Sequence, residues 1–161
     1  MILVVDTGPL IALSCVDLLS VLPRLAKKIY LPYAVALEAT GDLTKPGARM
    51  IRKAIDDGIL HISLAAKTNT LETLSLLLGA GEAEALALAS QMQAVAVIDD
   101  RQARNIAAKN GVKITGTAAL LVQMKQSKQI NQVDPYLQKL SAVGYRLPPS
   151  LCKQIRAQCG E

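Results

Sequence analysis

Short apolar runs rich in β-branched residues alternate along the chain with longer stretches whose apolar residues recur every three to four positions. The short runs are typical of buried strands and lie at residues 2–5, 29–31, 60–63, 94–98 and 112–115. The longer stretches predict helices at residues 10–14, 33–40, 48–56, 71–78, 79–93, 101–110, 117–126, 135–142 and 149–158. Because strands and helices alternate, we predict an α/β fold, a three-layer α/β/α sandwich around a central parallel sheet.

Turn and capping residues set the boundaries of these elements. The segment Asp-Thr-Gly-Pro ends the first strand and begins a helix, and Pro32 precedes the helix at 33–40. Gly111 ends a later helix, and Asn69 or Thr70 is expected to cap the helix at 71–78. Each strand is therefore followed closely by a loop or a helix N-terminus.

The composition excludes several classes of protein. With 161 residues the chain has the size of one domain, and its hydrophobic content of 51% comes mainly from Ala, Leu, Ile and Val. It contains no Phe or Trp and only four Tyr, so the aromatic platforms of RRM-type and OB-type binding modules are missing. A net charge of +5 favours a polyanionic partner.

The cysteines and the N-terminus bear on where the protein works. Three cysteines and a single histidine, His61, have neither the spacing of a zinc site nor an even count for disulfides, which suits a reducing compartment. The apolar N-terminus lacks a basic leader and is interrupted by Asp6 and Pro9. We therefore expect a buried strand there, rather than a signal peptide or a membrane span, and a cytoplasmic location.

Acidic residues occupy positions that the predicted fold would bring together. Asp6 and Asp99 directly follow strands, and open parallel sheets bind ligands beyond the carboxyl ends of their strands, although each Asp could instead cap a helix. Glu82 shares a helical stripe with apolar residues, whereas Glu84 points to nearly the opposite side. Both could instead complement the helix dipole, which explains Glu84 better than Glu82. Glu38 lies in an apolar helix, where a buried carboxylate needs a nearby Lys or Arg or a shared metal ion.

Clustered carboxylates indicate metal chemistry. They repel one another at neutral pH and require a hard cation, and Mg²⁺ or Mn²⁺ suits ligands that are all oxygen. One such ion, or a pair, can polarise a phosphoryl group and lower the pKa of a bound water, as in metal-dependent nucleases. A phosphatase of the haloacid-dehalogenase type is disfavoured because Asp-Thr-Gly stands where it needs Asp-X-Asp, and no GxxxxGK[ST] or GxGxxG motif occurs.

The succession of VVDTGPLIAL, an isolated Glu38, GEAEALALA and AVIDDRQAR resembles the PIN-domain family, and within it a branch related to VapC-type ribonuclease toxins. The resemblance implies a sheet ordered 3-2-1-4-5 with catalytic acids gathered at one end. It implies that Asp6, Glu38 and Glu82 are the first three acids and that the fourth is Asp99 or Asp100. We favour Asp99 as the ligand because it closes the strand, with Asp100 as a further candidate that binds water or a partner.

Other polar residues near these acids are candidates for substrate binding. Thr7 would hydrogen-bond Asp6 or a substrate phosphate, or it is simply a turn hydroxyl. The basic candidates for gripping phosphates are Arg49, Arg52, Lys53, Arg101 and Arg104. An ordinary solvated helix face is the alternative explanation for these charges.

The chain is expected to form one PIN-like domain with a core at 1–125, where the resemblance lies, and a helical extension at 126–161. Leu151 and Ile155 recur on one face of the last helix, so the extension should pack on the domain or on a second copy. Lys153 and Arg156 are expected to remain in water.

These observations favour a Mg²⁺- or Mn²⁺-dependent endoribonuclease, with the toxin of a toxin-antitoxin pair as its more specific form. The expected partners are RNA, a small antitoxin protein and a second copy in a homodimer, with no membrane association. The alternative is a non-catalytic PIN-like scaffold that binds RNA or protein.

Overall fold

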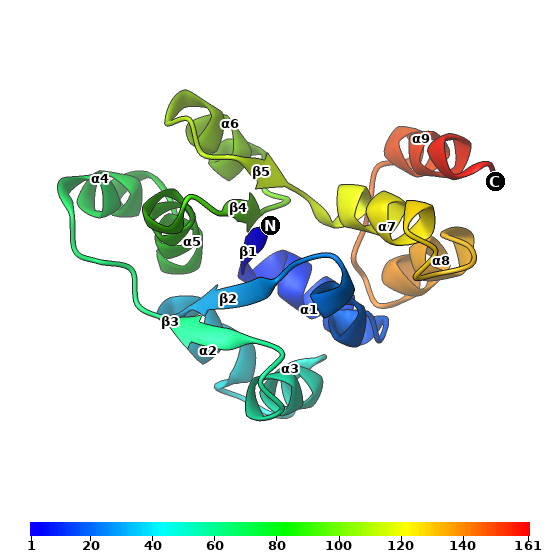
Figure 1. The fold of residues 1–161 in the computed structure, drawn as a ribbon, viewed down its shortest axis with the longest axis horizontal. Coiled ribbons are helices and arrows are strands. Elements are labelled where there is room, and N and C mark those ends of the chain that lie inside the picture. The colour runs from blue at the N-terminus through cyan, green and yellow to red at the C-terminus, as the bar shows by residue number, and fades with distance from the viewer.

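The centre of the fold is a five-stranded parallel sheet (Figure 1). The computed structural model describes all residues from 1 to 161. The strands are β1 (Ile2–Val5), β2 (Lys28–Pro32), β3 (His61–Ser63), β4 (Val95–Val97) and β5 (Ile114–Thr115). They lie in the order β3-β2-β1-β4-β5, and all neighbouring strands are parallel. The predicted α/β class and the implied strand order are confirmed.

Helices cover both faces of this sheet. They are α1 (Thr7–Cys15), the 3₁₀ helix η1 (Leu19–Arg24), α2 (Tyr33–Thr40), α3 (Ala48–Asp56), α4 (Asn69–Leu77), α5 (Ala80–Met92), α6 (Arg101–Lys109), α7 (Thr117–Gln126), α8 (Asp134–Ala142) and α9 (Pro149–Cys159). Successive β1 side chains point to opposite faces, so Leu3 and Val5 pack in a cluster with α1, α3 and α7 to α9. Val4 packs in a second cluster with α4, α5 and α6. None of the helices is long and apolar enough to span a membrane.

Two local features differ from the sequence-based expectation. The cap of α4 is Thr68, whose side chain accepts a hydrogen bond from the Leu71 amide at 3.2 Å, so the expectation of Asn69 or Thr70 is wrong. Thr68 has the extended backbone that an N-cap needs, whereas Asn69 is already helical. The 3₁₀ helix η1 was not predicted, because so short an element has no periodic apolar pattern to reveal it.

The C-terminal helices pack back on the domain, α8 against α1 and α9 against α7. Ile155 of α9 is only 2% exposed, and α9 lies against α7. Lys153 is exposed, and the Arg156 side chain is 41% exposed while it forms an ion pair with Asp134 at 2.6 Å. The side chain of Glu161 accepts hydrogen bonds from the amides of Val133 and Asp134 at the start of α8. The last residue therefore fixes α9 to the beginning of α8.

Candidate functional site

Acidic side chains from separate parts of the chain surround one hollow at the carboxyl edge of the sheet. The hollow has a volume of about 990 Å³, and we call it the acidic hollow. Its acidic lining residues are Asp6, Glu38, Glu82, Asp99 and Asp100. No Lys, Arg or His is among the residues that line it. The hollow therefore has an excess of negative charge and no basic side chain of its own.

Asp6 lies deepest in the acidic hollow. It directly follows β1 at the N-cap position of α1, yet its side chain makes no capping hydrogen bond. The residue is 7% exposed, and burial raises the pKa of its carboxyl to about 6. The negative charges of Glu82, Glu38 and Asp99 add to this increase in the pKa, while a hydrogen bond from the Thr7 backbone opposes it. The Asp6 carboxylate therefore does not cap α1, and burial disfavours its charged form.

Glu38 reaches the acidic hollow from α2 and is held by Thr7. The Thr7 hydroxyl donates a hydrogen bond to Glu38 Oε2 at 2.9 Å, so its carboxylate partner is Glu38 and not Asp6. Glu38 is exposed and belongs to no ion pair, so the buried carboxylate that the apolar helix suggested is not found. A Cβ on Gly81 would lie 3.3 Å from Glu38 Oε2, which shows how closely α5 approaches this pair.

Glu82 and Glu84 have different partners although both begin α5. Glu82 Oε2 accepts a hydrogen bond from the Gly79 amide at 3.3 Å, which opposes the rise in its pKa caused by partial burial and by the charges of Asp100 and Glu38. Glu84 Oε2 accepts one from the Ala34 amide at 3.0 Å, in the first turn of α2. Glu84 therefore complements the N-terminus of a different helix, not that of its own, and does not line the acidic hollow.

The two aspartates that follow β4, Asp99 and Asp100, have different hydrogen-bond partners. Asp100 is the N-cap of α6, and its Oδ1 accepts a hydrogen bond from the Ala103 amide at 2.8 Å. Asp99 accepts hydrogen bonds from the amide and hydroxyl of Thr117, at 2.9 and 2.6 Å, and from the hydroxyl of Tyr145. Asp100 therefore caps the helix that follows β4, whereas Asp99 binds the first amide of α7. The preference for Asp99 as the functional acid stays a prediction.

Tyr145 is the site residue that the sequence did not reveal. It lies between α8 and α9, half-buried, and donates a hydrogen bond to Asp99 Oδ2. Burial, the charge of Asp99 and that hydrogen bond raise the pKa of Tyr145 well above its ordinary value. The residue follows Gly144, which has a φ of +86°, in a loop without periodic pattern. The one available signal was its rarity in a chain with four Tyr and no other large aromatic residue.

The basic candidates fall into two groups. Arg101 begins α6 directly after the acids, and Arg104 follows one turn later, where its guanidinium donates a hydrogen bond to the Ile98 carbonyl at 2.8 Å. The other three, Arg49, Arg52 and Lys53, are exposed on α3, and none of them lines the acidic hollow. Of these three, only Lys53 is in an ion pair, with Asp57 four residues further along the chain. The structure thus brings the α6 arginines, and not the α3 residues, next to the acids.

The donor set suits a hard divalent cation, but the side chains do not converge on one point. All the charged groups of the acidic hollow are carboxylates, and none of them belongs to the three ion pairs of the chain. No group of three His, Cys, Asp or Glu side chains is close enough to hold a metal ion as placed. Instead Glu38, Glu82 and Asp99 are each turned toward a hydrogen-bond donor of the protein.

A parallel sheet in this order, with acids gathered at its carboxyl edge, defines a PIN-like α/β domain. The family model DUF3368, described as a PIN domain, matches residues 2–161, and the chain belongs to this PIN-domain family. The match continues through residues 126–161, so the expectation that the family resemblance ends near residue 125 is wrong.

The other comparisons add little detail. No curated protein matches the chain. Among solved structures, it is similar to a chain described as "A domain of a functionally unknown protein from Methanocaldococcus jannaschii DSM 2661", with 19% identity and a TM-score of 0.46. That similarity covers 71% of this chain and 89% of the other.

Proposed function

We propose that this PIN domain is a Mg²⁺- or Mn²⁺-dependent endoribonuclease. The observation that carries the proposal is the acidic hollow, which is lined by carboxylates from four segments and by no basic side chain. Such an arrangement destabilises the folded chain unless a cation binds, because like charges repel and Asp6 is buried. If the domain had only a structural role, replacing one of these acids by a neutral residue would increase its stability.

In this proposal Asp6, Glu38, Glu82 and Asp99 hold the ion, with Asp100 at the rim. A bound Mg²⁺ or Mn²⁺ would polarise the phosphoryl group and supply an activated water. To reach it, the three outer carboxylates would turn away from the donors that hold them now. Thr7, once released by Glu38, would have a hydroxyl free to donate to a phosphate oxygen, and Arg104 would contribute positive charge beside Asp99.

The alternative is a PIN-like scaffold that binds RNA or protein without cutting. The hydrogen bonds that keep Glu38, Glu82 and Asp99 apart favour this second candidate. A cleavage assay separates the two: purified protein and labelled single-stranded RNA are incubated with Mg²⁺, Mn²⁺ or EDTA. We expect cleavage with either ion and none with EDTA. Metal titration that produces no cleavage of any of several RNAs, and no change in thermal stability, would favour the scaffold.

The α3 residues give a separate prediction about RNA binding. Replacing Arg49, Arg52 and Lys53 together by glutamine should weaken RNA binding and reduce the slope of log K against log salt by about 2, since each phosphate contact on single strands accounts for about 0.7. The single-turnover cleavage rate at saturating RNA should stay unchanged, because none of the three lines the acidic hollow. Fluorescence anisotropy over a range of KCl concentrations measures the slope.

A matched control removes the same charge elsewhere. Lys27, Lys109 and Lys113 are exposed and belong to no ion pair, so their triple replacement by glutamine lowers the net charge equally. If both triple variants show the same slope, α3 makes no specific contact and its charges belong to an ordinary solvated face.

The proposal extends to protein partners, namely a small antitoxin and a second copy in a homodimer. Tyr33 and Leu37 lie four residues apart on α2 and are 48% and 55% exposed, and Leu37 lines the acidic hollow next to Glu38. An apolar pair in that position suits a protein that covers the site. Light scattering on the intact chain tests the dimer, and copurification with a neighbouring small gene product tests the toxin role.

A further inference from the structure

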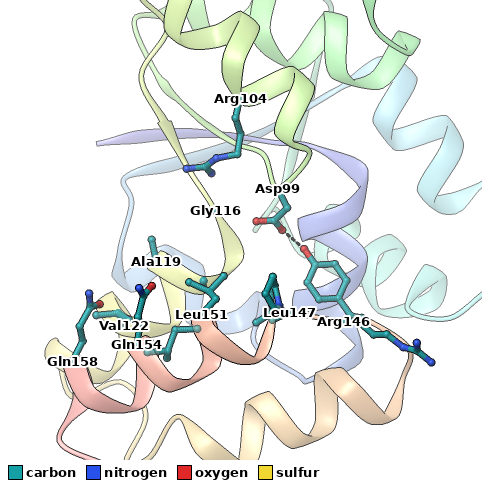
Figure 2. Close-up of a pocket in the computed structure, with 14 residues that line it drawn as sticks. Asp99, Arg104, Gly116, Ala119, Val122, Arg146, Leu147, Leu151, Gln154 and Gln158 are labelled. Carbon is teal, nitrogen blue, oxygen red and sulfur yellow. Dashed lines mark hydrogen bonds between the residues drawn. The ribbon is translucent and has the colours of Figure 1, made fainter.

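A second hollow runs between α7 and α9 and joins the acidic hollow at Asp99. It has a volume of about 520 Å³, within the roughly 300 to 1,000 Å³ of small-molecule sites, and we call it the α7–α9 groove. Figure 2 shows Arg104 on one side of the groove and Gln154 and Gln158 of α9 on the other. Asp99, which accepts a hydrogen bond from Tyr145, lies at the end of the groove nearest the acidic hollow.

The groove and the acidic hollow share part of their walls. Asp99 and Tyr145 line both, so a chain-like ligand in one hollow could continue into the other. Gly116 lies at the junction, where a Cβ would be 2.7 Å from Asp99 Oδ1 and 3.0 Å from Arg104 Nη1. Only glycine lets the carboxylate and the guanidinium approach the backbone so closely. An acid of the site and a basic group of the groove therefore meet at one point of the chain.

The polar groups of the groove match the parts of a nucleotide. Arg104 belongs to no ion pair, and guanidinium groups bind phosphate through paired N–H donors. Gln154 and Gln158 are exposed, lie one helical turn apart on α9 and make no hydrogen bond within the protein. Each amide can both donate and accept, as the edge of a base requires. Leu151 and Ala119 supply apolar surface between these groups.

We propose that the α7–α9 groove binds the nucleotide next to the cleaved phosphate of single-stranded RNA. Arg104 contacts the phosphate, and Gln154 and Gln158 contact the base edge. A groove of this volume has room for about one nucleotide, and a base within a duplex would present its edge to its own pairing partner. The placement next to the cleaved phosphate rests on the proposed ribonuclease function, whereas binding of a nucleotide in the groove does not.

The test measures binding under conditions that prevent metal-dependent cleavage. The full chain is titrated in EDTA against short fluorescent homopolymers of adenosine, cytidine, guanosine and uridine. We expect the wild type to prefer one base. The double variant Gln154→Ala with Gln158→Ala should bind that homopolymer about tenfold more weakly and lose the preference, since two hydrogen-bonding contacts to the base are removed. Both side chains are exposed, so circular dichroism should show the same fold.

A control pair makes the outcome specific. Gln126→Ala with Gln132→Ala removes two exposed glutamines that do not line the groove, and this variant should bind as the wild type does. The groove proposal is wrong if the Gln154 and Gln158 double variant binds RNA as well as the wild type does, or if both double variants lose binding equally. If that double variant binds normally and the wild type cleaves RNA, only the groove proposal fails. If binding depends on Gln154 and Gln158 but the wild type never cleaves RNA, only the ribonuclease proposal fails.

Discussion

Replacing Asp6 by asparagine should abolish metal-dependent RNA cleavage, with a loss of at least about a hundredfold that corresponds to several kcal/mol of metal assistance. Asparagine preserves the size of the side chain but removes the charge that attracts the cation. Asp6 makes no capping hydrogen bond, so the start of α1 should tolerate the change. The measurement is the initial rate of cleavage of a labelled RNA at saturating Mg²⁺. An Asp6→Asn protein that cleaves at the wild-type rate would exclude the metal mechanism.

The same variant should change how stability depends on pH. The pKa of Asp6 rises from 3.8 to about 6 on folding, so between these pH values the folded state holds a proton that the unfolded state has lost. The contribution of Asp6 to the free energy of unfolding should therefore fall as the pH rises from about 4 to 6, by about 1 to 3 kcal/mol at 1.36 kcal/mol per pKa unit. Urea denaturation in EDTA at several pH values measures it. Asp6→Asn should lack this component, so its stability relative to the wild type should increase with pH across the window.

Two glutamates on one helix provide a matched comparison. Glu82→Gln changes a residue of the acidic hollow, whereas Glu84→Gln changes one that accepts a hydrogen bond from the Ala34 amide outside it. Cleavage should be lost in the first variant and retained in the second. Equal effects in both variants would mean that general damage to the start of α5, and not loss of an acid from the hollow, explains the result for Glu82.

Much of the candidate site could be predicted because it depends on the chain's local pattern. Asp6 and Asp99 follow strands, and parallel strands end at the same edge, so their proximity follows from the fold class. The position of Glu82 on the helical wheel distinguished it from Glu84. The wheel could not reveal that Glu84 accepts a hydrogen bond at the start of α2, because that contact joins residues 50 positions apart. A helical wheel describes one helix and contains no information about its neighbours.

Tyr145 marks the limit of such arguments. It is 46 residues from Asp99, and the turn that brings it there depends on how α8 packs on the core. The basic residues show the same limit in another form, because charge on a helix face is visible in the sequence while its distance from the acids is not. Arg104 and the α3 residues carry the same charge, yet only Arg104 lines a hollow next to Asp99.

We propose that residues 1–161 form a single folding unit, in which the tail is part of the core. Five residues beyond position 126 belong to the main hydrophobic cluster: Ile130, Val133, Leu137, Leu140 and Ile155. At about 1.5 to 3 kcal/mol for each buried aliphatic side chain, their burial is comparable to the roughly 5 to 15 kcal/mol of net stability of a typical domain. Deleting residues 127–161 should therefore cause unfolding or aggregation, visible by circular dichroism and light scattering.

A milder change separates the tail's structural role from its role in the site. Ile155→Ala should lower the free energy of unfolding by about 2 to 5 kcal/mol, because Ile155 is 2% exposed between α9 and the core. Leu76→Ala is the control, since Leu76 is 87% exposed and should change stability little. At saturating RNA, the single-turnover cleavage rate of the folded fraction of Ile155→Ala should persist at low temperature, because Ile155 lines the α7–α9 groove but not the acidic hollow. A truncated protein that stays soluble, melts as the intact chain does and still cleaves RNA would show instead that neither the core nor Asp99 depends on the tail, and Tyr145 would then have no part in the site.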